Sequence, residues 1–293
     1  MAVTLTQLRA FMAVVQAGSV HAAARQLFVS QPSVSAALAA LAREVGTDLV
    51  ERHGRGIRLT AAGEAYRPYA AEVLGLLEQG RDAASEAERP EHARIRLAAV
   101  NTAGEYLIPA VIQAYRRAEP GAEVLLEIGN RRSVLERVES RAADLAVAGR
   151  PPNRNVTGRA FLDNELIVVA REPAEDLASL TWLLREEGSG TRAATEAFLA
   201  DREIEPREVL TLGSNGAVKQ ALSIGLGATL ISVHAVAREL RDGTLVRLPA
   251  SGTPLRRPWY SLVARGVEPR PAVQRFREFL HSAAAADAIE AAL

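Results

Sequence analysis

The chain contains 293 residues, a length that is typical of two domains of ordinary size. Hydrophobic residues make up 48% of it and charged residues 24%, which excludes a disordered chain. The absence of cysteine excludes disulfide scaffolds, iron–sulfur clusters, cysteine-ligated zinc and thiol catalysis. The five histidines show no H-x-x-x-H spacing, so no metal site is expected. Because the sequence has no signal peptide and no apolar run of about eighteen residues, we expect a cytoplasmic protein without a membrane partner.

The charge is unevenly distributed, although the net charge is zero. Residues 1–60 carry six arginines against three acids, a balance of +3, and residues 61–90 carry three arginines against six acids, a balance of −3. A basic module followed by an acidic connector favours an anionic partner for the first sixty residues. A solvated surface is the alternative interpretation, since a small excess of arginine is common there.

The first two predicted elements are short helices. The first has apolar residues at helical spacing and ends at Gly18, and its apolar residues are Leu5, Leu8, Phe11 and Val15. Ser19 can cap the second helix, which spans His21–Leu27 and carries three consecutive small alanines that allow another helix to cross closely.

The third predicted helix begins at Ser30, a good N-cap, and has Pro32 in its first turn, where no free N–H is needed. Its apolar stripe is followed by Gly46, which suits the position just after a helix; the stripe consists of Val34, Leu38, Leu41 and Val45. A tight turn between the second and third of three short helices is typical of a helix-turn-helix.

Two short strands, Leu49–Arg52 and Ile57–Leu59, are predicted next, joined by a glycine-bearing turn over 53–56. Such a hairpin is a wing, and its arginines can reach phosphates or a narrow minor groove. A solvated hairpin would explain the same arginines, but the preceding helix-turn-helix favours DNA.

The residues named so far resemble the winged helix-turn-helix of LysR-type transcriptional regulators. The resemblance is dense over about sixty residues and includes Gly18-Ser19, Ala23-Ala24, Val29–Ser35, Glu51-Arg52 and Leu59–Gly63. Ala36 and Ala42 stand where the family often has polar or charged side chains, which leaves few base-reading groups on the third helix. Val50 replaces the family's usual Phe. Ser35 is as well explained by helix packing as by a DNA contact. The residues expected to contact double-stranded DNA are Ser30, Gln31, Pro32, Ser33, Ser35, Arg52, Arg55 and Arg58.

We assign residues 1–61 to the DNA-binding domain and residues 62–90 to a linker. A helix is predicted over Ala62–Ala87, with a kink at Pro68. Its apolar seam indicates either a partner helix or packing against its own domain; the seam consists of Ala62, Tyr66, Tyr69, Val73, Leu76 and Gly80. The resemblance implies a homodimer through this helix and further implies a homotetramer, and RNA polymerase is a further candidate partner.

From residue 94 onward, apolar strands alternate with helices, which predicts an α/β fold with parallel sheets. The predicted strands are Ile95–Val100, Val124–Ile128, Leu145–Ala148, Leu166–Ala170, Val209–Leu212, Thr229–Val233 and Tyr260–Ala264. The predicted helices are Glu105–Arg117, Ser133–Arg141, Gly190–Asp201 and Ala217–Gly225. Ligands bind outside the carboxyl ends of such strands, and the polar turn Gly188–Arg192 is the best candidate there.

Residues 91–293 resemble the LysR-type effector domain, which has the two-lobed fold of type 2 periplasmic binding proteins. Segments such as Glu187–Arg192 and Gly225–Gly227 look like the regulators of carbon-fixation operons. This implies no cofactor but a small effector, a carboxylate or a phosphorylated metabolite. It also implies lobe I at 91–161 and 268–293 and lobe II at 162–267, with crossovers near Ala160–Asp163 and Gly266–Pro269. The predicted effector-binding residues are Asn101, Thr102, Asn130, Gly149, Ser189, Thr191, Arg192 and Ser214.

Two other functions would explain parts of the sequence. A serine hydrolase would use Ser189 or Ser232 with His234, but the G-x-S-x-G elbow is absent. A constitutive DNA-binding protein would need no polar cleft. We therefore predict a DNA-binding regulator that is not an enzyme and that responds to a small anionic metabolite bound between two lobes.

Overall fold

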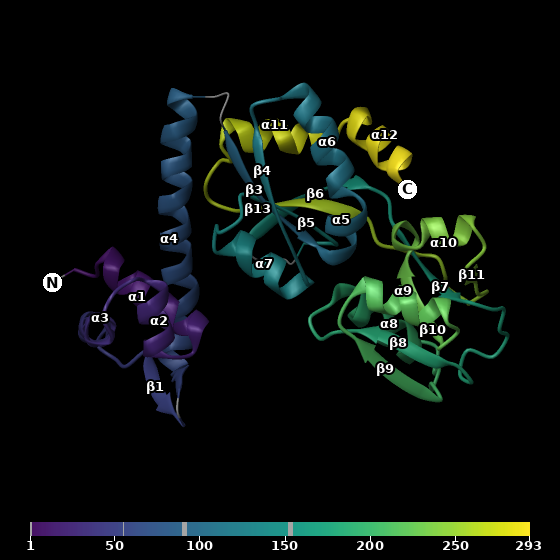
Figure 1. Cartoon of the computed structure of the whole chain (residues 1–293), viewed down its shortest axis with the longest axis horizontal. Helices are drawn as coiled ribbons and strands as arrows, with labels where there is room; N and C mark the ends of the chain where they lie inside the picture. The colour runs from purple at the N-terminus through teal and green to yellow at the C-terminus, as the bar shows by residue number, and fades with distance from the viewer. Residues whose placement is uncertain (1, 55, 90–92, 152–154) are drawn as a thin grey trace. The chain divides into compact units, whose positions relative to one another are not determined.

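The computed structural model describes residues 2–54, 56–89, 93–151 and 155–293 (Figure 1). The chain forms two compact units, Met1–Arg81 with Ser140–Ala142, and Asp82–Glu139 with Ala143–Leu293. Within the described ranges, no helix combines the length and the apolar character that a membrane crossing requires.

The first unit contains three short helices, a hairpin and most of a long helix. Its elements are α1 (Leu5–Ala17), α2 (Val20–Gln26), α3 (Gln31–Val45), β1 (Val50–His53), β2 (Gly56–Leu59) and α4 (Ala61–Glu88). The predicted caps are confirmed: Ser19 and Ser30 accept hydrogen bonds from the first turns of α2 and α3. Gly18 and Gly46 end α1 and α3 in the left-handed conformation. Phe11 is fully buried in the core that these helices share.

The apolar seam of α4 divides into two parts. Ala62 and Tyr66 pack against the core of the helix-turn-helix, and the Tyr66 ring lies edge-on to Phe11 with a centroid distance of 5.8 Å. Tyr69, Val73 and Leu76 remain exposed. Packing against its own domain therefore accounts for the first part of the seam but leaves the second part without a covering element in this unit.

The second unit contains two lobes, each built on one sheet. The sheet of lobe I has the order β4-β3-β5-β13-β6. Helices α6, α11 and α12 cover one of its faces and α7 covers the other (Figure 1). The elements of lobe I are β3 (Arg94–Val100), α5 (Asn101–Tyr106), α6 (Ile108–Ala118), β4 (Glu123–Gly129), α7 (Arg131–Glu139), β5 (Leu145–Ala148), β6 (Val156–Leu162), β13 (Trp259–Ala264), α11 (Pro271–Leu280) and α12 (Ala283–Ala292).

Lobe II has a sheet of order β11-β7-β10-β8-β9, with β12 also paired to β7. Helix α8 packs on one face of this sheet around Trp182, and α9 packs on the other around Leu183. The elements are β7 (Glu165–Ala170), β8 (Thr181–Arg185), α8 (Gly190–Ala200), β9 (Glu208–Leu212), α9 (Asn215–Ser223), β10 (Ala228–Ser232), the 3-10 turn η2 (Val233–Ala235), α10 (Ala237–Arg241), β11 (Val246–Arg247) and β12 (Leu255–Arg256).

Two expectations about this unit are wrong. The sheets are mixed, because β13 pairs antiparallel with β5 and β6, and β7 pairs antiparallel with β10. The second crossover lies before Trp259 and not at Gly266–Pro269, since β13 is already a strand of the lobe I sheet. Lobe II therefore ends about ten residues earlier than the predicted 267. The first crossover passes through Asp163 and Asn164, between β6 and β7.

The last turn of α4 belongs to the second unit and ends in a buried ion network. Glu86 accepts a hydrogen bond from the backbone N–H of Ala272 at 2.7 Å and pairs with Arg270 Nη1 at 2.8 Å. Arg270 Nη2 also bonds Asp144 Oδ2 at 3.1 Å, and Arg96 Nη2 bonds Asp144 Oδ1 at 3.2 Å. Since buried charges are costly unless they are paired and hydrogen-bonded, this network fixes the end of α4 to lobe I.

The structure predicts one source of acid sensitivity in lobe I. Burial, together with the nearby cations Arg159 and Arg277, lowers the pKa of His281 to about 4. The ordinary pKa of histidine is about 6.5, so between pH 6.5 and 4 the unfolded chain binds more protons than the folded chain. The free energy of unfolding should therefore fall as the pH falls through this window.

The variant His281→Gln should show a weaker dependence of stability on pH in this range. Urea unfolding of the parent and the variant at pH 7, 6 and 5 measures the difference. Parallel curves for the two proteins would contradict the assignment.

Candidate functional site

The first candidate surface is the exposed start of α3. Ser30, Gln31, Pro32, Ser33 and Ser35 are all exposed, whereas the intervening apolar residues are buried in the core. The hydroxyl of Ser30 lies 2.7 Å from that of Ser33, and the Gln31 amide lies 2.6 Å from Nδ1 of His21 on α2. The start of α3 thus presents a small polar surface that fits a recognition helix. DNA contacts by these residues stay a prediction.

The second part of this surface is the hairpin. Its strands pair antiparallel, with Arg52 opposite Ile57 and Glu51 opposite Arg58. Both Arg52 and Arg58 are exposed, but Arg58 Nε forms an ion pair with Glu51 at 2.6 Å, and Arg52 has no ion pair within the described residues. Arg55 lies outside the described residues. Because Glu51 already neutralises part of the charge of Arg58, Arg52 is the stronger candidate for a phosphate contact.

We predict that three variants distinguish phosphate contacts from base contacts. Arg52→Ala should weaken binding to any duplex and lower the slope of log affinity against log salt by about 0.9, the value for one lost phosphate contact. Arg58→Ala should change the slope less, because of its ion pair with Glu51. Gln31→Ala should keep the slope and lose about 1–3 kcal/mol of preference for a selected site, if Gln31 contacts a base.

Fluorescence anisotropy with a random duplex and with a duplex selected from a random pool, at several salt concentrations, measures all three effects. An unchanged slope for Arg52→Ala would rule out its phosphate contact.

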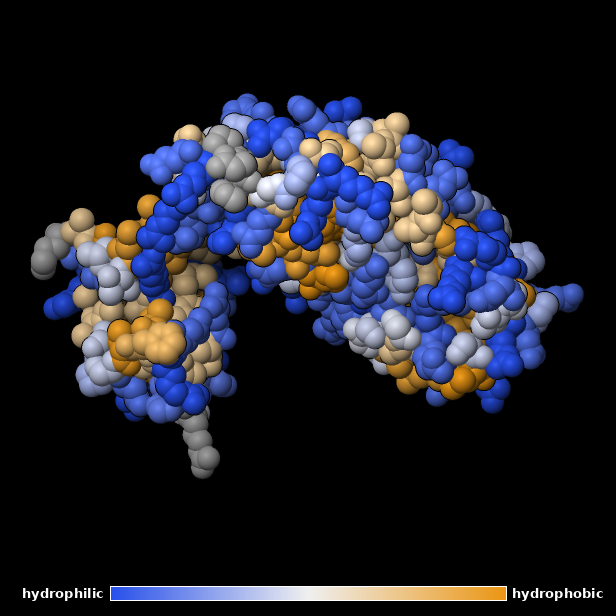
Figure 2. Space-filling model, turned by 45° about the horizontal axis from the view of Figure 1, so that its top comes forward, coloured by the Kyte–Doolittle hydropathy of each residue, from blue (hydrophilic) through white to orange (hydrophobic). Residues whose placement is uncertain are grey.

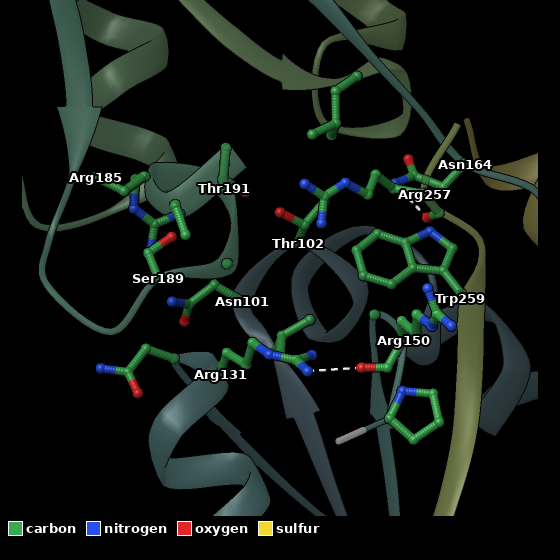
Figure 3. Close-up of a pocket in the computed structure, with 17 residues that line it drawn as sticks. Asn101, Thr102, Arg131, Arg150, Asn164, Arg185, Ser189, Thr191, Arg257 and Trp259 are labelled. Carbon is green, nitrogen blue, oxygen red and sulfur yellow. Dashed lines mark hydrogen bonds between the residues drawn. The ribbon is translucent and has the colours of Figure 1, made fainter. Parts of the chain in front are cut away.

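The second candidate site is a pocket of about 350 Å³ between the two lobes of the second unit (Figure 3). Its volume is suited to a small metabolite. Six of the predicted effector residues line it, namely Asn101, Thr102, Asn130, Gly149, Ser189 and Thr191. The structure thus brings together residues from four separate turns, all of which follow strands, as the rule for α/β folds requires.

The turn before α8 forms one wall of the pocket. Ser189 caps this helix by accepting a hydrogen bond from the N–H of Arg192, and Gly190 and Thr191 begin the helix. Gly188 has a φ of +82°, and a Cβ there would lie 3.2 Å from the amide nitrogen of Asn130 in lobe I. Glycine therefore favours both the left-handed backbone conformation and the close approach of the lobes at this position.

Two predicted residues do not line the pocket. The guanidinium of Arg192 bonds Glu196 at 2.7 Å and the Arg185 carbonyl oxygen at 3.1 Å. Ser214 is exposed and caps α9 through a hydrogen bond from the N–H of Ala217. Both residues serve local helix structure in this arrangement.

Three arginines that are not among the predicted effector residues also line this pocket. Arg131, Arg150 and Arg257 come from the start of α7, the end of β5 and the second crossover. Arg131 donates to the Arg150 carbonyl oxygen at 2.6 Å (Figure 3). Burial lowers the pKa of Arg131, and the charge of Arg257 lowers it further. Within the described ranges, no carboxylate pairs with Arg131 or Arg257, so the pocket holds positive charge that is not compensated.

A fourth arginine in the pocket is already neutralised. Arg185 is buried and holds both carboxylate oxygens of Glu186, at 2.8 and 3.1 Å, and it also donates to Asn215 Oδ1. The Asn215 amide donates in turn to Thr102 Oγ1 at 3.3 Å and to Glu105 Oε2 at 3.0 Å. Since Thr102 and Glu105 belong to lobe I and Asn215 to lobe II, this network links the lobes beside the pocket.

The two crossovers meet at the base of the pocket. The Arg257 N–H donates to the Asn164 carbonyl oxygen at 2.8 Å, and the Asn164 amide donates back to the Arg257 carbonyl at 3.1 Å. Ser232 Oγ lies 2.6 Å from Asn164 Oδ1. Asn164, Arg257 and Trp259 all line the pocket, so a ligand there touches the segments about which the lobes can move.

The remaining interpretations fit the geometry poorly. The Ser232 hydroxyl donates to Asn164, and His234 Nδ1 accepts from the Trp259 indole at 3.3 Å, so these two side chains do not form a nucleophile–base pair. Across the part of the chain that the structure describes, no group of three or more His, Asp or Glu side chains could hold a metal ion.

A winged helix-turn-helix joined by a long helix to a two-lobed domain with a pocket defines a ligand-responsive DNA-binding regulator. Residues 5–64 match the sequence profile of the bacterial regulatory helix-turn-helix proteins of the lysR family, and residues 88–285 match that of the LysR substrate binding domain. The chain belongs to the LysR family of transcriptional regulators and is a regulator, not an enzyme.

Its relatives include regulators of carbon fixation. It is 33% identical to the HTH-type transcriptional activator CmpR of Synechocystis, over 94% of each chain. It is 36% identical to the RuBisCO operon transcriptional regulator of Allochromatium vinosum, over 97% of this chain and 98% of that one. The regulatory domain of CcmR from Synechocystis, solved in complex with 2-PG, is 32% identical with a TM-score of 0.60. That similarity covers 64% of this chain and 95% of the CcmR chain.

Proposed function

We propose that the effector of this regulator is a small metabolite that carries a carboxylate or phosphate group and binds in the pocket between the lobes. The observation that carries the proposal is the pair Arg131 and Arg257, which face one pocket without a carboxylate partner within the described ranges. The charge of Arg257 contributes to lowering the pKa of Arg131, and an anion that bound beside the two cations would relieve this repulsion. The start of α8 adds backbone N–H groups and the hydroxyls of Ser189 and Thr191.

The likeness to the CcmR regulatory domain supports the same class of ligand, because 2-PG, 2-phosphoglycolate, carries both a phosphate and a carboxylate. In the proposed mechanism, the ligand binds one arrangement of the lobes more tightly than another. Only this difference in affinity can change the operator affinity of the regulator.

We predict that Arg131→Ala weakens binding of such a ligand by about ten- to a hundred-fold, which corresponds to a charge-assisted hydrogen bond of about 1.5–3 kcal/mol. Calorimetry with 2-phosphoglycolate, sugar phosphates and small carboxylates measures this effect. Arg132→Ala is the matched control, because Arg132 is the exposed neighbour of Arg131 and does not line the pocket. Equal affinity of the parent and Arg131→Ala for any anion that binds would place the site elsewhere.

We also propose that the chain dimerises through α4. Three apolar side chains of the seam are exposed although they follow helical spacing, with exposed fractions of 70% for Tyr69, 43% for Val73 and 36% for Leu76. A second copy of the same helix would bury them. A dimer would also provide two helix-turn-helix modules, which a site of useful specificity requires. Pairing of effector domains into a tetramer is a further part of this proposal.

Val73→Glu should give monomers with much weaker binding to selected DNA, because it places a charge in the seam. The control is Ser85→Glu, which adds the same charge at an exposed position about 180° around the helix from Leu76. Light scattering and anisotropy measure mass and DNA affinity. If the Val73→Glu variant were still a dimer, dimerisation through this seam would be ruled out.

A further inference from the structure

The turn between α2 and α3 contains a phenylalanine in a position that glycine usually occupies. Helix α2 ends in a Schellman motif, in which the N–H of Phe28 bonds the Arg25 carbonyl at 3.2 Å and the N–H of Val29 bonds the Ala24 carbonyl at 3.0 Å. Phe28 occupies the left-handed position of this motif, with a φ of +56°. Residues other than glycine and asparagine disfavour this conformation.

The Phe28 ring is not buried by its own domain. It is 95% exposed, and the next residue, Val29, is 48% exposed. Helices α1 and α3 of the same domain end with Gly18 and Gly46 at the equivalent conformation. Phe28 is therefore unfavourable in two ways, in its backbone and in its exposed apolar surface, and neither is offset within the described part of the domain.

The surroundings of Phe28 indicate what covers it. It lies two residues before Ser30, the cap of α3, and three before Gln31, so it is continuous with the exposed polar surface at the start of α3. In a helix-turn-helix the first residues of the recognition helix enter the major groove, while the preceding helix crosses the DNA backbone. The turn that joins them must then lie against the sugar–phosphate wall of the groove.

We propose that Phe28 packs against deoxyribose rings of the DNA backbone at the edge of the major groove. The deoxyribose carbons supply an apolar surface at every position of a duplex, so this contact adds affinity without selecting a sequence. It also neutralises no phosphate and releases no counterion. The contribution of Phe28 should therefore be independent of salt, unlike that of a wing arginine.

The test compares Phe28→Asn with Phe28→Leu in the full-length chain. Asparagine tolerates the left-handed conformation but removes the apolar ring, whereas leucine keeps an apolar side chain. We expect Phe28→Asn to bind a random 30-base-pair duplex about five- to ten-fold more weakly at every salt concentration, and Phe28→Leu to stay within about two-fold of the parent. The salt slope should stay at the parent value for Phe28→Asn and fall for Arg52→Ala.

A matched control is available at the end of α8. Glu203 has a φ of +52° in a second Schellman motif, closed by hydrogen bonds from Glu203 to Ala200 and from Ile204 to Leu199. Glu203→Asn lowers the cost of the same left-handed backbone conformation, but in the effector domain. Both asparagine variants should keep or raise the melting temperature, but only Phe28→Asn should lose DNA affinity.

Two results would overturn the proposal. One is unchanged affinity of Phe28→Asn for both the random duplex and a duplex selected from a random pool. The other is a lower mass of Phe28→Asn in light scattering, which would show that a second copy of the chain covers the ring.

Discussion

The buried network of Glu86, Arg270 and Asp144 is the interaction on which a regulator of this design depends. A signal from the effector domain can reach the DNA-binding domain along the chain only through α4, and this network joins the end of α4 to the start of α11 and to lobe I. Removing Arg270 would leave the buried carboxylate of Glu86 without its counter-charge, so the loss of this arginine should be strongly destabilising. At its other end, α4 is part of the helix-turn-helix core through Tyr66. Each end of α4 is therefore packed into one of the two units.

The arginines of the pocket are of two kinds. One is paired with a carboxylate and stabilises the protein, and the others are available to bind a ligand. Arg185 is buried, paired with Glu186 and tied to Asn215, so its charge is used within the protein. Arg131 and Arg257 have no such carboxylate partner in the described ranges, and their charge is available to an anion. An anion that entered beside Arg185 would compete with Glu186 for its guanidinium. This competition would also disturb the hydrogen bonds from Asn215 to Thr102 and Glu105, because Arg185 donates a hydrogen bond to the same Asn215 side chain.

Local chemistry made much of the fold predictable. Ser19, Ser30, Gly18 and Gly46 mark helix ends by capping, which depends only on neighbouring residues. The rule that ligands bind at the carboxyl ends of strands led to Thr102, Ser189 and four other pocket residues. The same rule applied to Arg131 and Arg150, which follow β4 and β5, but arginine is so frequent in this chain that nothing distinguished them.

The errors arose where pairing between distant segments decides the structure. The partners of β13 are β5 and β6, more than ninety residues earlier, so the second crossover was misplaced and Arg257 was missed. Arg192 does not line the pocket, and its ion pair with Glu196 could be predicted from their spacing of four residues on a helix.

The position of β13 also has a consequence for biosynthesis. Strand β6 pairs only with β13 in the order of the lobe I sheet, and β13 is made almost one hundred residues after β6. As the chain leaves the ribosome, β3, β4 and β5 can associate early, but β6 has no strand partner until the whole of lobe II has been synthesised. An unpaired strand edge promotes aggregation, and long-range pairing slows folding. We therefore expect lobe I to complete its fold only after lobe II has been synthesised, and a premature stop in lobe II would release β6 without its strand partner.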